Sequence, residues 1–292
     1  MSERVKSALA VGLLKLLGKL PLVWLHRIAN TLILIPLLLP NHSHKQTKIN
    51  IDRCFPELNP KQKSKLIRQS LLHTLYAALE MGINWTQSSQ VGLQAVTSVT
   101  GRDCLAGAYH TGGVILVTPH LGNWELFANW AANHYPVTAL YKPAKLNGLD
   151  DLIHDARSRA GMQLAPATAK GVMKLKRALI KGEVNLILPD QEPPPSSGIV
   201  SRWFNQPAYT MTLANQLANT KNTRVILGFA RRLESSNGFA IELEDITNQC
   251  QAATIEASVG ALNDAMEALV RRAPEQYQWE YRRFKYTLEQ DG

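Results

Sequence analysis

The chain has 292 residues, of which 45% are hydrophobic and 19% charged, so it can bury a sizeable core and does not resemble a disordered protein. Its 32 Lys and Arg outnumber its 23 Asp and Glu, which gives a formal net charge of +9. A surface this basic favours anionic partners, and composition alone leaves nucleic acid, an acidic protein and anionic lipid headgroups open.

The cysteines exclude a disulfide framework. Cys54, Cys104 and Cys250 are odd in number and lie far apart, without the paired spacing of a zinc site or a redox dithiol. We therefore expect a reducing compartment, in which these cysteines act as small apolar side chains in the core.

Residues 1–40 are dense in Leu, Ile and Val and predict a helical, membrane-anchoring segment. Charged residues and prolines interrupt it, so no run reaches the roughly 18 to 20 apolar residues that a spanning helix requires. Val5–Leu17 predicts an amphipathic helix in the membrane interface, and Leu22–Leu39 a shallow anchor. Whether the segment lies on the membrane or spans it stays open. A cleavable signal peptide is disfavoured because no small-x-small cleavage site follows, and a pair of core helices is the soluble alternative.

Residues 41–292 predict a single domain of the α/β class, because β-type runs alternate with helical patterns and no internal repeat or long linker intervenes. Asn59 before Pro60 predicts the start of a helix that reaches Trp85. The strand runs are Val114–Val117, Val137–Leu140, Val184–Leu188 and Arg224–Phe229, and the helical patterns lie near Glu125–Asn133, Asp150–Ala160, Lys170–Ile180 and Thr210–Asn219. A turn at Ser235–Gly238 predicts an antiparallel partner strand at Phe239–Leu243, and Thr254–Arg272 predicts a last helix. We expect a mixed, mostly parallel sheet covered by helices.

The stretch from Val114 to Glu125 has the pattern of a strand, a tight turn and a helix start. His120 falls at the carboxyl end of the strand, where α/β proteins gather their catalytic groups. Asn123 fits the N-cap, Gly122 permits a sharp reversal, and Glu125 in the first helical turn is expected to approach the imidazole. A carboxylate that fixes the imidazole tautomer would make His120 a general base for a hydroxyl nucleophile. The structural alternative is a His at a strand end and a solvated Glu.

The segment Thr118-Pro-His-Leu-Gly-Asn-Trp-Glu125 resembles the His-x-x-x-x-acid motif of glycerolipid acyltransferases, in the form found in bacterial lipid A biosynthesis (lauroyl/myristoyl) acyltransferases. Further blocks are similar to that family in the same order along the chain: Asn50–Glu57, Tyr141-Lys-Pro, Arg157-Ser-Arg-Ala-Gly161, Leu188-Pro-Asp-Gln191, Pro274–Trp279 and Arg282–Lys285. Together the blocks cover nearly the whole chain.

The resemblance implies a glycerolipid acyltransferase-like fold and an O-acyltransferase of lipopolysaccharide biosynthesis in a Gram-negative bacterium. Such an enzyme moves a fatty acyl group from acyl carrier protein to a hydroxyl of a lipid A precursor at the cytoplasmic face of the inner membrane. The family needs no metal or organic cofactor. An acidic carrier protein and a phosphorylated acceptor would account for the excess of Lys and Arg, and nucleic acid has no place in this activity.

The resemblance also implies residue roles. His120 would act as general base and Glu125 would orient it. Substrate binding is expected from Asn123, Arg157, Arg159, Asp190 and Gln191. For the two arginines the alternative is a solvated helix face, and for Asp190-Gln191 it is a structural turn.

The carboxyl-terminal segment interleaves Arg282, Arg283 and Lys285 with aromatic residues. It could bind a membrane interface or acceptor headgroup, or pack with its cations left in water. Two stretches depart from the family's pattern, since Glu192–Gly198 is rich in proline and Trp203–Ala208 stands where a Phe-Phe-Gly-like turn is common. The wall of the acyl pocket, and with it the acyl chain length, is therefore not inferred. An acyltransferase for another glycolipid or a lysophospholipid, and a non-catalytic lipid-binding membrane protein, are the competing functions.

Overall fold

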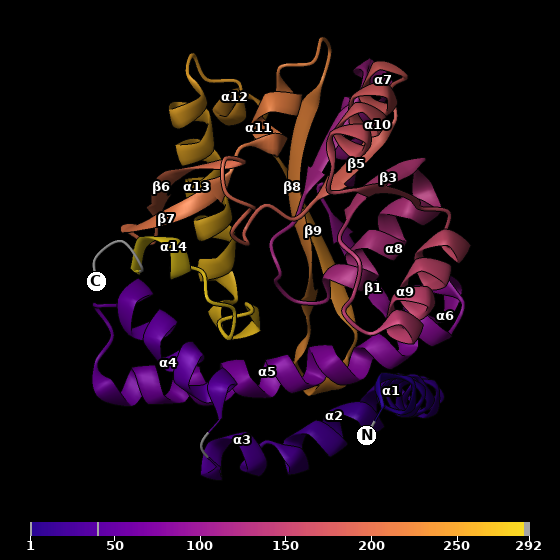
Figure 1. Ribbon diagram of the computed structural model, residues 1–292, viewed down its shortest axis with the longest axis vertical. Helices are drawn as coiled ribbons and strands as arrows, with labels where there is room; N and C mark the ends of the chain where they lie inside the picture. The colour runs from indigo at the N-terminus through magenta and orange to yellow at the C-terminus, as the bar shows by residue number, and fades with distance from the viewer. Residues whose placement is uncertain (1, 40, 289–292) are drawn as a thin grey trace.

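The computed structural model describes residues 2–39 and 41–288, which surround a central seven-stranded sheet (Figure 1). In sheet order the strands are β1 (Val96–Thr100), β9 (Phe239–Asp245), β8 (Arg224–Arg232), β2 (Val114–Val117), β5 (Val184–Ile187), β3 (Val137–Tyr141) and β4 (Gln163–Pro166). Neighbouring strands run parallel except β8 and β9, so the predicted mixed, mostly parallel sheet is confirmed. Every residue of β2 and β5 is buried, as continuous apolar runs in a covered sheet require.

Helices cover both faces of this sheet. Each face has its own hydrophobic core, and successive side chains of β2 alternate between the two. Val114 and Leu116 belong to one core, and Ile115 and Val117 belong to the other. The first face is covered by α7 (Arg102–Thr111) and α8 (Trp124–His134), and the second by α10 (Ala169–Ile180), α11 (Leu213–Ala218) and α13 (Ile255–Arg272). The other short elements are α6 (Ser89–Leu93), α12 (Thr247–Cys250), α14 (Lys285–Leu288) and the 3-10 turns Glu234–Ser236 and Pro274–Gln276.

Most of the predicted elements are confirmed, but the helix expected near Thr210–Asn219 begins too early. Residues up to Met211 belong to β7 (Gln206–Met211), which pairs antiparallel with β6 (Gly198–Trp203) in a separate hairpin. Phe204 and Asn205 form its two-residue turn with positive φ angles of 48° and 59°, the conformation that such tight hairpins require. The sequence analysis missed this hairpin because it lies within a stretch that lacks strand alternation.

The first five helices lie across the ends of the strands, at the bottom of Figure 1. They are α1 (Glu3–Leu17), α2 (Leu22–Leu32), α3 (Leu34–Leu38), α4 (His42–Cys54) and the long α5 (Pro60–Thr86), which starts with the predicted Asn59 cap. The end of α1 crosses α5 closely, since a Cβ on Gly18 would lie 2.4 Å from the carbonyl oxygen of Gly82.

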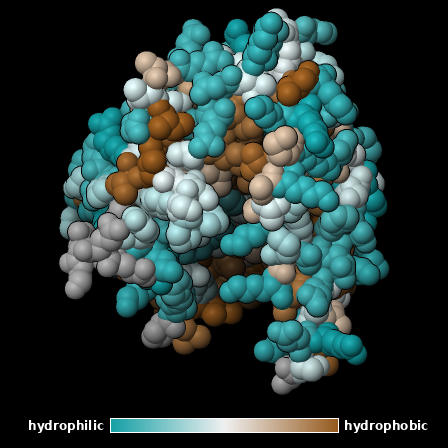
Figure 2. Space-filling model, turned by 45° about the horizontal axis from the view of Figure 1, so that its top comes forward, coloured by the Kyte–Doolittle hydropathy of each residue, from teal (hydrophilic) through white to brown (hydrophobic). Residues whose placement is uncertain are grey.

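The outer face of α1 to α3 is apolar and exposed. Leu9, Leu13 and Leu16 are 60%, 57% and 62% exposed and follow one another at helical spacing on α1, whereas Leu25 and Ala29 of α2 are fully buried. Within the described residues, no single helix is long and apolar enough to cross a membrane. By contrast, the side of the molecule shown in Figure 2 is mostly hydrophilic, with hydrophobic side chains gathered in a hollow near its centre.

The cysteines are free thiols, as expected, and Cys54 and Cys250 are buried in the core.

Candidate active site

The turn that follows β2 is held by hydrogen bonds to two other segments of the chain. The N–H of Gly122 donates to the carbonyl of Gln276 over 3.1 Å, and the N–H of Asn123 donates to the carbonyl of Ala230 over 2.9 Å. Gly122 has φ +62°, and a Cβ there would lie 2.1 Å from the Ala230 oxygen, so only glycine fits. The predicted reversal at Gly122 is confirmed, and it fixes the position of His120.

Asp190 is the carboxylate that contacts His120. Strand β5 lies beside β2 with Ile187 opposite Val117, so the residues after both strands emerge together at the carboxyl edge. One oxygen of Asp190 lies 2.9 Å from Nδ1 of His120, and the other accepts from the backbone N–H of His120 over 2.9 Å. Burial alone would raise the pKa of Asp190, but its interactions with His120 outweigh burial and hold that pKa below its usual value.

Glu125 does not make the contact with His120 that was expected from the sequence, and pairs with an arginine instead. Its side chain is buried and ion-paired with Arg157 of α9 (Asn147–Arg159), whose Nε lies 3.3 Å from Oε2. Burial tends to lower the pKa of Arg157, but the charge of Glu125 outweighs burial and raises that pKa, so the guanidinium stays charged. Asp190 therefore has the contact with the imidazole that was expected of Glu125, because strand adjacency, and not helical proximity, brings Asp190 to His120.

The Nε2 atom of His120 faces side-chain amides. Nε2 of Gln191 lies 3.4 Å from it and donates to Oε1 of Gln278 over 3.3 Å. An amide nitrogen can only donate, so the ring nitrogen accepts, which places the imidazole proton on Nδ1, toward Asp190. The ring of Trp124 packs edge-on against His120 with centroids 5.2 Å apart.

A cavity of about 230 Å³ adjoins this edge. It lies between α5 and the segment after α13, and Trp124, Gln278 and Glu280 line it. Burial raises the pKa of the Glu280 carboxyl, and the hydroxyl of Thr74 donates to that carboxyl over 3.0 Å. His120 does not line this cavity, but its neighbours Trp124 and Gln278 do. We call this cavity the catalytic groove after the role proposed for it below.

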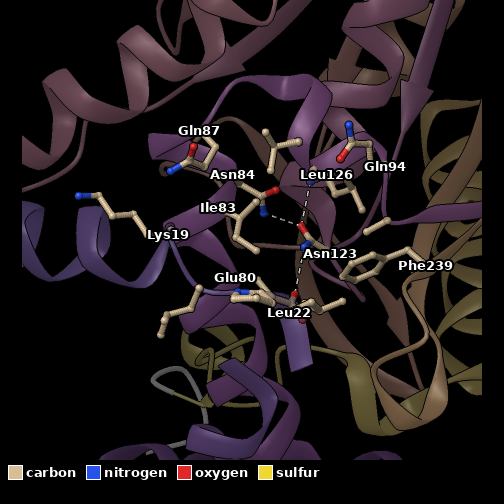
Figure 3. A pocket seen from close by; sticks show the side chains of 16 residues that line it. Lys19, Leu22, Glu80, Ile83, Asn84, Gln87, Gln94, Asn123, Leu126 and Phe239 are labelled. Carbon is tan, nitrogen blue, oxygen red and sulfur yellow. Dashed lines mark hydrogen bonds between the residues drawn. The ribbon is translucent and has the colours of Figure 1, made fainter. Parts of the chain in front are cut away.

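Asn123 caps α8, as predicted. Its Oδ1 accepts from the N–H of Leu126 and from Nδ2 of Asn84, each over 2.9 Å, and its Nδ2 donates to Glu80 over 3.0 Å (Figure 3). Protein partners thus engage the polar atoms of Asn123, and a role in substrate binding stays a prediction. Arg159 donates to the carbonyl of Trp85 over 3.0 Å at the surface.

The sequence analysis missed a buried ion pair behind the turn. Nε and Nη2 of Arg232, at the end of β8, donate to the two oxygens of Glu80, each over 2.6 Å. Nη2 also donates to the carbonyl of Gly122 over 3.2 Å, and His26 lies 2.7 Å from Glu80. Burial raises the pKa of Glu80, yet Arg232 and His26 outweigh it and the pKa is lowered. The available signal was a carboxylate within an apolar stretch of α5.

The carboxyl-terminal cluster packs inward. Trp279 and Phe284 are each 1% exposed and Arg283 only 2%. Arg283 donates to the carbonyl of Tyr209 and to the hydroxyl of Thr210, each over 2.7 Å, so this cation is buried, whereas Arg282 and Lys285 are exposed, as the packing alternative expected. Burial lowers the pKa of Arg283.

The described residues include no group of three or more His, Cys, Asp or Glu side chains that could hold a metal ion.

Comparison with known proteins identifies the family. Residues 2–286 match the family described as "Bacterial lipid A biosynthesis acyltransferase". The chain belongs to this family. It is 26% identical over 282 residues to a lipid A biosynthesis lauroyltransferase of Escherichia coli (strain K12), which covers 95% of this chain and 90% of that protein.

Other lipid A biosynthesis acyltransferases are similar over slightly shorter stretches. A lipid A biosynthesis acyltransferase of Haemophilus influenzae is 26% identical over 239 residues, 80% of this chain and 73% of its own length. A lipid A biosynthesis palmitoleoyltransferase of Escherichia coli (strain K12) is 26% identical over 243 residues, 81% of this chain and 76% of its own. The resemblance drawn from the sequence blocks is thereby confirmed, and the chain is an acyltransferase of lipid A biosynthesis.

Proposed function

We propose that this acyltransferase moves a fatty acyl group from acyl carrier protein to a hydroxyl on a lipid A precursor, at the cytoplasmic face of the inner membrane. The observation that carries the chemistry is the geometry at His120. Asp190 binds its Nδ1, and its Nε2 faces the carboxyl edge of the sheet beside the catalytic groove. The names of the similar lauroyl- and palmitoleoyltransferases support a fatty acyl group as the transferred unit.

In the proposed reaction Nε2 of His120 takes the proton of the acceptor hydroxyl. The hydroxyl oxygen forms a bond to the thioester carbonyl carbon, and the carbon–sulfur bond then breaks. The departing thiolate takes the proton back from the imidazolium, which leaves an ester and the free thiol of the carrier. Asp190 would orient the ring and stabilise the imidazolium, and this general-base step is worth about a hundred- to ten-thousandfold in rate.

The tetrahedral oxyanion needs hydrogen-bond donors. The backbone N–H groups of His120, Leu121, Gly122 and Asn123 all donate to acceptors within the protein. The side-chain amide of Gln191 also donates within the protein, but over the longer distances of 3.4 Å to Nε2 of His120 and 3.3 Å to Gln278. We propose that the acceptor hydroxyl displaces this amide from Nε2 and that the amide then donates to the oxyanion.

Glu125 and Arg157 would serve the acceptor. Glu125 fixes the guanidinium, whose side chain keeps 20% exposure and lies 5.5 Å from the Tyr141 ring. An ionised, pre-oriented guanidinium is suited to bind a phosphate of the acceptor through paired hydrogen bonds. Under this proposal Glu125 acts through Arg157. Arg159, which follows Arg157 by two residues at the exposed end of α9, would add a second cation.

Membrane association is proposed for residues 1–40. It is supported by the exposed apolar stripe of α1, Leu9, Leu13 and Leu16, and by α3, where Leu38 is 75% exposed. Such a surface suits a helix that lies in the interface with its apolar face buried in lipid. It would place the enzyme where a lipid acceptor resides.

The decisive experiment compares the wild-type enzyme with His120→Ala in transfer from lauroyl acyl carrier protein to a lipid A precursor, scored by mass spectrometry. We expect a loss of about a hundredfold or more with an unchanged melting temperature. His110→Ala, at an exposed position of α7, is the matched control and should keep full activity. Near-normal turnover of His120→Ala would contradict the mechanism. Activity of the wild-type enzyme on another lipid only would show that the proposed acceptor is wrong.

A further inference from the structure

A larger cavity is lined by another face of α5 than the catalytic groove, and Figure 3 shows it from close by. Its volume is about 610 Å³, within the range of about 300 to 1,000 Å³ typical of sites for small ligands. The walls are mainly hydrophobic and come from the α1–α2 turn, α5, α6, α8 and β9. The residues that define them are Leu20, Leu22, Ile83, Val91, Leu126 and Phe239. We call it the α5 cavity.

One polar atom that borders the α5 cavity has no hydrogen-bond partner among the described residues, and it stays accessible from the cavity. Asn84 is 7% exposed and uses its Nδ2 to bind Asn123, while no hydrogen bond of the described residues uses its Oδ1. In Figure 3 this oxygen points away from Asn123, into the space beside Leu126. An unpaired amide oxygen beside an apolar wall can accept a hydrogen bond from a ligand with an apolar body and a donor group, or from an accompanying water.

The rim carries a cation. Lys19 lines the cavity at the end of α1, extends outward in Figure 3, and takes part in none of the ion pairs found among the described residues. A lysine at the mouth of an apolar cavity suits an amphiphile whose anionic head stays outside while its chain lies inside.

The cavity is continuous with the exposed apolar face. Gly18 to Leu22, the turn between α1 and α2, forms one of its walls. Leu16 before the turn and Trp24 after it are 62% and 51% exposed. If this face lies on a bilayer, an acyl chain reaches the cavity along the turn without crossing water.

We propose that the α5 cavity binds one acyl chain of an anionic membrane lipid, at a site separate from the catalytic groove. This inference rests on the membrane placement in the proposed function, and not on the proposed acyl donor or acceptor. Because the floor of the cavity is the Asn84–Asn123 pair that caps α8, a bound chain packs against the support of the catalytic turn.

The test measures binding of lauroyl lysophosphatidate to the full chain, in solution and without vesicles, by isothermal titration and native mass spectrometry. The wild-type protein should bind one equivalent. Ile83→Trp, which fills the cavity from α5, should weaken binding about tenfold or more. Leu22→Trp fills it from the other wall and keeps the test valid if the first variant fails to fold. Lys19→Glu should produce a smaller loss, and lauroyl lysophosphatidylcholine, which carries no net charge, should bind more weakly than the lysophosphatidate.

The control variant is Ala78→Trp, which narrows the catalytic groove along a different face of α5. It should bind the lipid like the wild type. Unchanged affinity in both folded cavity-filling variants, or a loss confined to Ala78→Trp, would overturn the proposal. The proposed membrane placement is tested separately. If it is wrong, the wild-type protein will not sediment with anionic vesicles.

Discussion

The turn after β2 and the outer face of α1 to α3 are built in opposite ways. Around the turn the carboxylates of Glu80, Glu125 and Asp190 are almost fully buried, and each is paired with an Arg or His side chain. On the outer face of α1 to α3, leucines stand exposed with nothing packed on them within the described chain. The polar groups of the turn thus find their partners inside the protein, whereas the apolar face of α1 to α3 would be covered only by a partner surface.

This difference follows from the cost of burying charge. An ionised carboxylate inside a protein is stable only with a paired cation and hydrogen bonds, so the turn becomes rigid. An exposed apolar stripe needs no fixed partner geometry, which suits a fluid surface such as a bilayer.

Arg232→Met should cause the largest loss of stability, about 3 to 5 kcal/mol, because it leaves the buried Glu80 carboxylate unpaired. Denaturant unfolding measures this change. The matched control is Arg224→Met on the same strand, whose ion pair with Asp245 is largely exposed and should be worth about 1 kcal/mol or less. Similar losses of unfolding free energy in both variants would show that the buried pair stabilises the protein no more than an ion pair at the surface.

Asp190→Asn should lower kcat about a hundredfold, because the imidazole loses the charge that stabilises its protonated form. Glu125→Gln should instead raise the KM for the lipid acceptor more than it lowers kcat, because it acts through Arg157. Steady-state kinetics with both substrates distinguish the two. A larger fall in kcat for Glu125→Gln than for Asp190→Asn would return the orienting role to Glu125.

Strong acid should remove the stabilisation that the buried carboxylates give to the turn. The pKa values of Asp190 and Glu80 are lowered in the folded state, so their stabilisation is complete above their unfolded pKa values of about 4. It is lost as the pH falls through the lowered folded values. The difference in unfolding free energy between wild type and Asp190→Asn should therefore shrink below about pH 4, and a difference that stays constant to pH 2 would contradict this.

Leu9→Ser combined with Leu13→Ser should have the smallest effect on the folded protein, within about 0.5 kcal/mol per site, because both side chains are exposed. The same variant should lose most of its sedimentation with anionic vesicles. Met173→Ser, which changes an exposed apolar residue of α10, is the control and should bind vesicles normally. Equal vesicle binding by all three proteins would show that α1 does not contact the membrane.

The local elements could be predicted from the sequence where the signal is short in range. The cap at Asn59, the reversal at Gly122 and the start of α8 at Asn123 depend on neighbouring residues and are confirmed. Strands β1 and β4 and the β6–β7 hairpin were not predicted. Val96–Thr100 and Gln163–Pro166 lack a continuous apolar run, and the hairpin depends on two residues with positive φ. The division at residue 40 stays a prediction.

The family, the α/β class and the position of His120 at the end of a buried strand can all be read from the sequence, because ordered motifs and apolar runs are local properties of the chain. Which carboxylate meets the imidazole depends on the tertiary structure. Placing β5 beside β2 brings Asp190 to His120 and leaves Glu125 to Arg157, and the long-range pairing of Glu80 with Arg232 follows from the packing of α5 beside β8. Partners so far apart in the chain are set by strand order and helix packing, which no local pattern of residues encodes.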